Sequence, residues 1–244
     1  MVQKEDTGSP IVVIGGHLTW PISYRRLARI LADVSGARVH VVPITPLDWL
    51  LGRVRGYGQL VFEVASTVDR ALLESDSGKA VLVGHSVGGI LARVYIGGDP
   101  PYGGRRYSGH RRVSHLITLG TPHNVSKGGS LAPISEVNEL FPGTLHANIR
   151  YLCVAGAAVD GATSRRARKR YERFVDDGRV AGDGKVPVKS ALLPGAGSLV
   201  LNDVYGRFYG GREGRWYGSD RETVERWWPE ELGVKSGLVE EPGA

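Results

Sequence analysis

One serine of this chain has neighbours that could make it a nucleophile. Ser86 lies in a Gly-x-Ser-x-Gly pattern at 84–88 that follows an apolar run at 80–83. Glycines on both sides permit the sharp strand-to-helix turn that lifts a serine hydroxyl above the end of a strand. Because the hydroxyl would then stand at the start of a helix, we predict that the N–H group of Val87 stabilises negative charge on a substrate oxygen.

A second hydrogen-bond donor to that substrate oxygen is expected in the loop after the first predicted strand. Gly15 and Gly16 end an apolar run that begins at Pro10, and His17 follows them. Two glycines leave the backbone uncrowded, so that its N–H groups can point at the serine. We predict the N–H group of His17 as this donor. In the alternative interpretation, the glycines only turn the strand toward the next helix.

The proton acceptor for the serine is harder to find. A serine hydroxyl is a weak nucleophile unless a neighbouring base takes its proton. Enzymes with a serine in this setting usually supply an Asp or Glu, and then a His, further along the chain. The chain has seven histidines, of which His146 is the last. The stretch 147–244 therefore offers no imidazole, and the nucleophile is easier to predict than its activation.

Strands and helices are predicted to alternate along the chain. Apolar runs indicate strands at 10–14, 38–44, 80–83, 113–119, 149–155 and 198–201. Helical spacing of apolar residues indicates helices at 24–34, 61–72, from 90 onward and at 221–228, with loops at 43–52 and 97–112. Repeated strand-helix units favour a parallel sheet that is covered by helices on both faces.

The composition fits one globular domain. Of the 244 residues, 41% are hydrophobic and 23% are charged, as in an ordinary globular core. We expect this domain at 10–232, with a flexible N-terminus at 1–9 and a flexible tail at 233–244. The first ten residues lack the apolar core of a secretory signal, and no apolar run approaches the roughly 18 residues of a membrane span. We therefore expect a cytoplasmic location, or an organelle stroma.

Neither the charge nor the single cysteine indicates a nucleic-acid or metal site. The net charge is +6, and the densest basic cluster lies at 165–173 around Ala167 and Tyr171. No nucleic-acid-binding motif accompanies the cluster, so we expect the solvated side of a helix. A milder alternative is that it attracts anionic substrates or an anionic membrane surface. Cys153 alone can form neither an intramolecular disulfide nor a thiolate cluster, and no metal or cofactor is expected.

The chain carries four short segments whose order is informative. They are Gly-Gly-His-Leu at 15–18, the serine motif at 84–89, Thr-Leu-Gly-Thr-Pro-His at 118–123 and Asp-Gly-Lys-Val-Pro at 183–187. Together they resemble the α/β-hydrolase superfamily, in its lipase-like and esterase-like branch, which includes small hydrolases of photosynthetic organisms. The resemblance extends from about Pro10 to Trp228. It implies an α/β-hydrolase fold and a hydrolase of small-molecule or lipid esters, with Ser86 as nucleophile.

The resemblance also implies an acidic partner after the strand that ends near Ala155. Asp160 follows that strand closely, whereas Asp183 lies in Asp-Gly-x-Val-Pro, which resembles the acid loop of the family after an insertion. We favour Asp183, whose role would be to accept a hydrogen bond from the base and to stabilise its charged form. Either aspartate could instead cap a turn beside its glycine.

The chain departs from the family where the base is expected. Relatives resemble the segment 202–206 but carry a histidine after the tyrosine, and this chain has Gly206 there. Three interpretations follow. His17 or His123 replaces the missing base, or the protein is a degenerate hydrolase that binds an acyl or ester ligand, or Gly206 is an introduced change in an active enzyme.

The segment 124–148 is longer than a simple connection, and segments of that length are often lids or binding loops. Its apolar residues could form a helix face over the site that receives an acyl chain. They are Leu131, Ile134, Val137, Leu140 and Phe141. The alternative is a surface helix packed on the core. Nothing in the sequence indicates an oligomeric state.

Overall fold

The computed structural model describes residues 8–125, 132–208 and 215–233. Its centre is a six-stranded sheet in the order β2-β1-β3-β4-β5-β8, in which every neighbouring pair is parallel. The strands are β1 (Ile11–Ile14), β2 (Val39–Val41), β3 (Ala80–His85), β4 (Val113–Leu119), β5 (Arg150–Gly156) and β8 (Gly197–Leu201). All six correspond to predicted strands, although β2 is shorter than expected.

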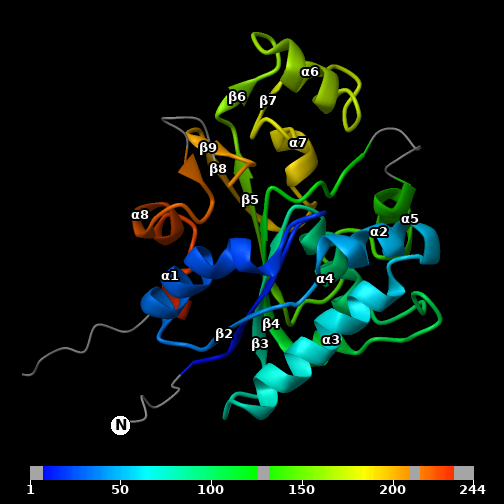
Figure 1. Ribbon diagram of the computed structural model, residues 1–244, viewed down its shortest axis with the longest axis vertical. Coiled ribbons are helices and arrows are strands. Elements are labelled where there is room, and N and C mark those ends of the chain that lie inside the picture. The colour runs from blue at the N-terminus through cyan, green and yellow to red at the C-terminus, as the bar shows by residue number, and fades with distance from the viewer. Residues whose placement is uncertain (1–7, 126–131, 209–214, 234–244) are drawn as a thin grey trace, which may run out of the picture.

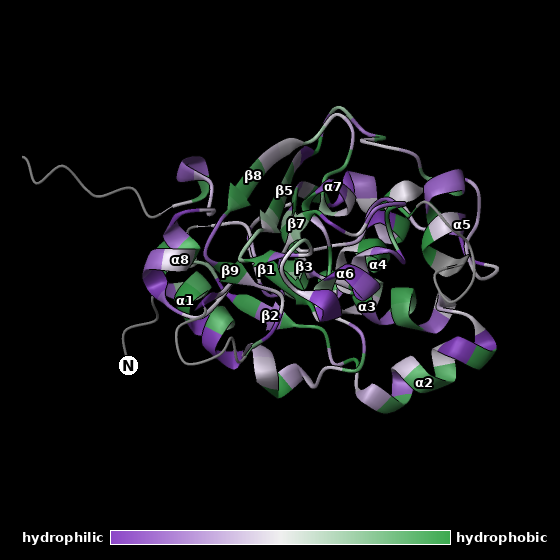
Figure 2. Ribbon diagram, turned by 90° about the horizontal axis from the view of Figure 1, so that it is seen from above, coloured by the Kyte–Doolittle hydropathy of each residue, from purple (hydrophilic) through white to green (hydrophobic). Residues whose placement is uncertain are grey.

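Helices cover both faces of this sheet (Figure 1). The two pairs are α1 (Arg25–Ser35) with α8 (Arg221–Glu225), and α3 (Gly58–Leu73) with α4 (Val87–Gly97). Side chains alternate along β1, so that Ile11 and Val13 pack toward the first pair and Val12 and Ile14 toward the second. Figure 2 shows the hydrophobic strands between helices that carry hydrophilic residues. The predicted parallel sheet with helices on both faces is confirmed.

Smaller elements surround this core. The helices are α2 (Pro46–Arg55), α5 (Ala132–Leu140), α6 (Arg165–Tyr171) and α7 (Val188–Ala191), and three short 3-10 turns lie at Pro21–Tyr24, Gly109–Arg111 and Glu230–Leu232. The short strands are β6 (Val159–Asp160), β7 (Ala181–Gly182), β9 (Val204–Tyr205) and β10 (Arg215–Trp216). Figure 1 shows β6, β7 and α6 beyond the carboxyl end of β5. These insertions therefore lie at the edge of the sheet where the serine is expected.

The predicted ends of the domain fall mostly on residues that the structure does not describe. This applies to the flexible N-terminus expected at 1–9 and to the tail expected at 233–244. Across the described ranges, every helix is too short or too polar to traverse a bilayer.

The loop predicted at 43–52 is wrong, because Pro46–Arg55 forms helix α2. Thr45 and Asp48 form a capping box, in which the Thr45 hydroxyl accepts from the Asp48 N–H and the Asp48 carboxylate accepts from the Thr45 N–H. Pro46 occupies the first turn, where a missing N–H group does no harm. The signal was therefore present, but the prolines and Gly52 were interpreted as loop residues.

Replacing the cap of α2 should weaken the fold measurably. We expect Thr45→Ala to lower the free energy of unfolding by about 1 kcal/mol, because the N–H group of Asp48 loses its acceptor. Urea denaturation measures the change. Thr45→Ser keeps the hydroxyl and should stay close to the wild type, and a Thr45→Ala variant of unchanged stability would show that the cap contributes nothing.

Candidate active site

Ser86 forms the turn between β3 and α4. Its backbone has φ 52° and ψ −129°, a region that residues with side chains rarely occupy. Such a conformation costs of order 1–3 kcal/mol and persists only when the surroundings enforce it. The N–H group of Ser86 donates to the carbonyl of Leu119 at 2.9 Å, and its hydroxyl makes no capping hydrogen bond to α4. The side chain is thus left available for chemistry.

The glycines of the serine motif let α4 approach the sheet closely. A Cβ at Gly84 would lie 2.5 Å from the Cα of Gly89, and a Cβ at Gly88 would lie 2.3 Å from the carbonyl oxygen of Ile14. A Cβ at Gly89 would lie 2.2 Å from the Thr121 hydroxyl oxygen. Any side chain at these positions would push the helix away from the strands. The spacing that suggested a nucleophile therefore has a steric cause.

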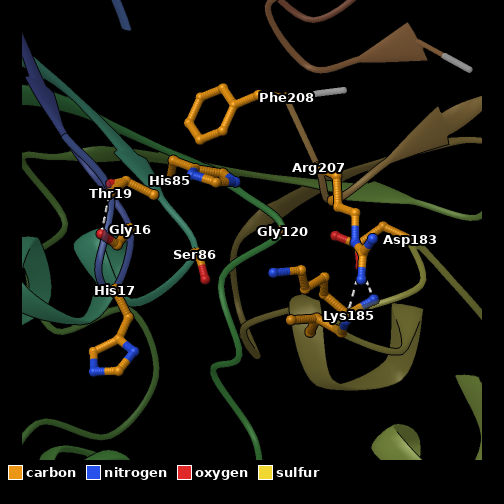
Figure 3. A pocket seen from close by; sticks show the side chains of 12 residues that line it. Gly16, His17, Thr19, His85, Ser86, Gly120, Asp183, Lys185, Arg207 and Phe208 are labelled. Atoms are coloured by element: carbon orange, nitrogen blue, oxygen red, sulfur yellow. Dashed lines mark hydrogen bonds between the residues drawn. The ribbon is translucent and has the colours of Figure 1, made fainter. Parts of the chain in front are cut away.

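Two adjoining cavities meet at Ser86. The first, which we call the serine cavity, has a volume of about 320 Å³. Its lining includes Gly16, His17, His85, Ser86, Gly120, Asp183, Lys185, Gly206, Arg207 and Phe208 (Figure 3). The second, which we call the α4 cavity, has a volume of about 420 Å³ and follows α4 away from Ser86. The structure thus brings Ser86, His17 and Asp183 to one cavity, and Val87 lines the other.

The two predicted oxyanion donors flank the serine. Val87 is the first residue of α4, where an N–H group has no partner within the helix. The loop of His17 is close as well, because a Cβ at Gly16 would lie 3.0 Å from the Cβ of Ser86. Within the described ranges neither N–H group has a hydrogen-bond acceptor, whereas the N–H group of Gly16 donates to the Tyr24 hydroxyl at 2.7 Å. Their role as donors to a substrate stays a prediction.

Asp183 is buried at the wall of the serine cavity. Its Oδ1 accepts from the N–H groups of Lys185 at 2.8 Å and Val186 at 2.7 Å, and its Oδ2 accepts from the Tyr217 hydroxyl at 3.0 Å. Burial raises the pKa of this carboxyl from 3.8 to about 6, although the three hydrogen bonds act in the opposite direction. Burial therefore disfavours the ionised form of Asp183, which lines the same cavity as Ser86.

Asp160, the competing aspartate, lies elsewhere. It is exposed at the end of β6, and its Oδ1 accepts from the N–H group of Ala162 at 2.7 Å. It does not line the serine cavity. Asp160 thus caps a turn, as the alternative interpretation expected, and the role of Asp183 as the acid stays a prediction.

Gly206 lies directly beside the Asp183 carboxylate. Its N–H group donates to the Asp183 carbonyl at 2.8 Å, and a Cβ on Gly206 would lie only 2.6 Å from Cγ of Asp183. Position 206, where the resemblance predicted a histidine, is therefore next to Asp183. The carboxylate fills the space that a side chain at 206 would need, so an imidazole cannot be added there unless the carboxylate moves.

Neither proposed replacement histidine is well placed. His123 is fully buried beneath the site, with Nε2 3.0 Å from the Thr118 hydroxyl, and burial holds its pKa well below the usual value. His17 lines the serine cavity, but its ring packs edge-on against Trp49 with centroids 5.3 Å apart. Figure 3 shows this ring directed away from the Ser86 hydroxyl. Partial burial, together with the charges of Arg53 and Lys185, lowers the pKa of His17.

His85 lines the serine cavity too, but it is a structural residue. Its Nδ1 lies 2.8 Å from the Tyr24 hydroxyl, and the ring is surrounded by the aromatic rings of Phe208 and Trp216. Burial lowers its pKa to about 3, so it holds a proton poorly.

Basic groups that line the two cavities were not predicted from the sequence. Lys185 and Arg207 line the serine cavity, and Arg53, Arg170 and Arg173 line the α4 cavity with Lys185. These residues come from distant parts of the chain. The signal that could have found one of them is that Lys185 lies two residues after the predicted acid. Among the described residues, no group of three or more His, Cys, Asp or Glu side chains could hold a metal ion.

The segment 124–148 contributes to the wall of the α4 cavity. Residues 126–131, including Leu131 of the predicted apolar face, lie outside the described residues. Ile134, Val137 and Phe141 are buried in the core cluster that includes α4, and the first two also line the α4 cavity. Helix α5 therefore packs on the core and also borders the site. Its opening as a lid stays a prediction.

The model of the family described as PGAP1-like alpha/beta domain matches residues 66–139, which contain β3, Ser86 and α4. No curated protein sequence matches the chain.

Several solved structures are similar at low identity. Carboxyl esterase 2 from the mycorrhizal fungus Tuber melanosporum is 16% identical with a TM-score of 0.46, over 82% of this chain and 69% of that one. The pyrethroid hydrolase PytH is 21% identical with a TM-score of 0.34, over 57% and 43%. Polyneuridine aldehyde esterase is 18% identical with a TM-score of 0.37, over 55% and 48%. The chain thus spans less than half the length of the last two.

The buried carboxyl of Asp183 should make stability depend on pH. A pKa raised on folding means that the folded state favours the protonated acid, so the stabilisation present below pH 3.8 is lost as the pH rises through about 6. This difference in pKa corresponds to about 3 kcal/mol.

Asp183→Asn removes the titrating group and keeps an oxygen for the N–H groups of Lys185 and Val186. We expect the free energy of unfolding of the variant, relative to wild type, to rise by about 2.5 kcal/mol between pH 4 and pH 7.5. Urea denaturation at both pH values measures it. A difference that stays constant with pH would mean that Asp183 keeps its ordinary pKa.

Proposed function

Because this chain has the α/β-hydrolase fold, with a strained serine between β3 and α4, we propose that it hydrolyses carboxylic esters with Ser86 as nucleophile. The observation that carries the proposal is the backbone of Ser86, at φ 52° and ψ −129°, which is enforced by three crowded glycines at the junction of two cavities. Strain of this kind is kept where a side chain must be presented for reaction.

The surroundings of Ser86 suit the first step of ester hydrolysis. Attack of its hydroxyl oxygen on an ester carbonyl would place negative charge on the carbonyl oxygen. The N–H groups of Val87 and His17 would bind that oxygen, with help from the positive end of the α4 dipole. Asp183 would stabilise the positive charge that a base acquires when it takes the serine proton.

The α4 cavity suits an apolar acyl group. Ile90, Leu91 and Val94 of α4 line one wall and Ile134 and Val137 of α5 line another. A cavity of about 420 Å³ is within the usual range for small-molecule sites. We therefore propose esters with an apolar acyl chain as the substrate class, and no cofactor enters this reaction.

Basic residues that line the α4 cavity influence which ligands approach it. Arg53 and Arg170 lie on its rim. The basic helix α6 buries Ala167 and Tyr171 and exposes Arg165 and Arg166. Such a surface favours anionic esters or a lipid surface of negative charge. We propose contact of this kind and no role in binding nucleic acid.

The nucleophile is tested by removing its hydroxyl. We expect Ser86→Ala to lower kcat/KM for p-nitrophenyl butyrate to the rate that oxyanion binding alone supports, which is roughly 1,000- to 10,000-fold above water. Ser198→Ala, at an exposed serine on β8, is the matched control and should retain wild-type activity. Equal rates for Ser86→Ala and wild type would end the proposal for this substrate.

Gly206 favours a second candidate, a protein that binds an acyl or ester ligand without turnover. The usual base is missing at the position beside Asp183. Under this candidate, a slowly hydrolysed ester would bind wild type and Ser86→Ala equally, and neither would release alcohol. Turnover that depends on Ser86 decides in favour of the enzyme.

The α4 cavity is tested by filling it. Val94→Phe adds bulk inside the cavity, so we expect kcat/KM for p-nitrophenyl decanoate to fall about 10-fold more than for the acetate, equal to about two buried methylene groups. Val200→Phe, on an exposed part of β8, should leave the ratio unchanged. A parallel loss on both esters would mean that the acyl chain lies elsewhere.

A further inference from the structure

Lys185 is the one amine that shares both cavities with Ser86 among the residues that the structure describes. Figure 3 shows its side chain extending from the loop after Asp183 across the serine cavity toward the Ser86 hydroxyl. Its charge also lowers the pKa values of His17 and His85, which lie on either side of the serine. The Lys185 ammonium therefore lies among Ser86, His17 and His85 in the serine cavity.

We propose that Lys185 replaces the missing histidine as the proton acceptor for Ser86. The inference rests on the proposed ester hydrolysis and names the group that makes it chemically feasible. A serine with a lysine base is an established alternative to the serine-histidine pair on other folds.

The loop that carries Lys185 is fixed from several directions. Asp183 Oδ1 accepts from the Lys185 N–H at 2.8 Å. The Gly184 carbonyl accepts from the Arg170 guanidinium at 2.9 Å, and the Gly184 N–H donates to the Tyr171 hydroxyl at 2.8 Å. Gly184 has φ +85°, which only glycine adopts readily. In this site Asp183 therefore positions the base through its backbone rather than through an imidazole.

A lysine can accept a proton only when its amine is neutral. The Lys185 side chain is exposed. Its pKa is nevertheless lowered by partial desolvation and by the charges of Arg207 and Arg170, while Asp183 acts in the opposite direction. Arg53 and Arg173 add positive charge around the adjoining cavity. A neighbouring cation is a known means of activating a lysine.

The other groups in the serine cavity are poorer acceptors. Arg207 cannot lose its proton under ordinary conditions. His85 binds Tyr24 and has a pKa of about 3, and the ring of His17 packs on Trp49. Apo structures commonly show such pairs apart, because the catalytic hydrogen bond forms fully only with substrate.

The reaction balances with Lys185 as the only proton carrier. The neutral amine takes the Ser86 hydroxyl proton while the serine oxygen bonds to the ester carbon and the carbonyl electron pair moves to oxygen. Collapse breaks the bond to the alkoxide, which leaves with the proton from the Lys185 ammonium, and an acyl-serine remains. Water then attacks this ester, loses its proton to Lys185, and the acid departs as the proton returns to Ser86.

The decisive variant is Lys185→Arg, which keeps the positive charge but cannot act as a base. We expect kcat for p-nitrophenyl butyrate to fall roughly 100- to 10,000-fold with little change in KM, and the alkaline ascending limb of the pH profile to disappear. Lys189→Arg, at an exposed lysine on α7, is the matched control and should behave as wild type.

A second variant tests the amine itself. Lys185→Cys should be inactive, and alkylation with 2-bromoethylamine should restore activity because it rebuilds a primary amine at the same distance. The other cysteine, Cys153, is buried and 2% exposed, which protects it from the reagent.

The outcomes separate the two proposals. Full activity of Lys185→Arg, or no rescue of the cysteine variant, would overturn the role of Lys185 while Ser86-dependent turnover in wild type would keep the ester hydrolase. An absence of Ser86-dependent turnover in wild type at every pH would overturn both.

Discussion

The site depends on the close approach of backbone to backbone where β3 turns into α4. Helix α4 reaches the sheet because Gly88 touches the Ile14 carbonyl and Gly84 touches Gly89 without side chains between them. This contact holds Ser86 in a conformation that an isolated peptide would avoid. It also directs the serine toward the carboxyl ends of β1 and β3, where the loops of a parallel sheet meet. Packing of the core thus holds the Ser86 hydroxyl in place.

Most of the charged groups that line the two cavities at the Ser86 hydroxyl are cationic. One buried carboxylate, Asp183, lines the serine cavity with Lys185 and Arg207, and Arg53 and Arg170 line the adjoining α4 cavity. In the family that the chain resembles, an imidazole would lie between acid and serine. Here the carboxylate packs against the bare Cα of Gly206 and binds the backbone of its own loop. Gly206 therefore leaves room for this carboxylate, and Lys185 lines the same cavity as Ser86.

Much of the fold and the nucleophile could be predicted from the sequence, because both follow from local patterns. Strands followed from apolar runs, and the turn at Ser86 followed from glycine spacing. Helix α2 was missed because Pro46 was interpreted as a loop residue and the Thr45–Asp48 cap was overlooked. The burial of His123 and the presence of Lys185 in the same cavity as Ser86 could not be predicted, because both depend on the packed sheet rather than on neighbouring residues.

The mass of the intact protein after reaction with a fluorophosphonate ester shows whether Ser86 is presented and activated. Such a probe phosphonylates a serine, with loss of fluoride, only when the hydroxyl is both presented and activated. The account predicts one adduct per chain, located by peptide mapping at Ser86. A protein that stays unmodified, or that carries the adduct on another residue, would contradict it.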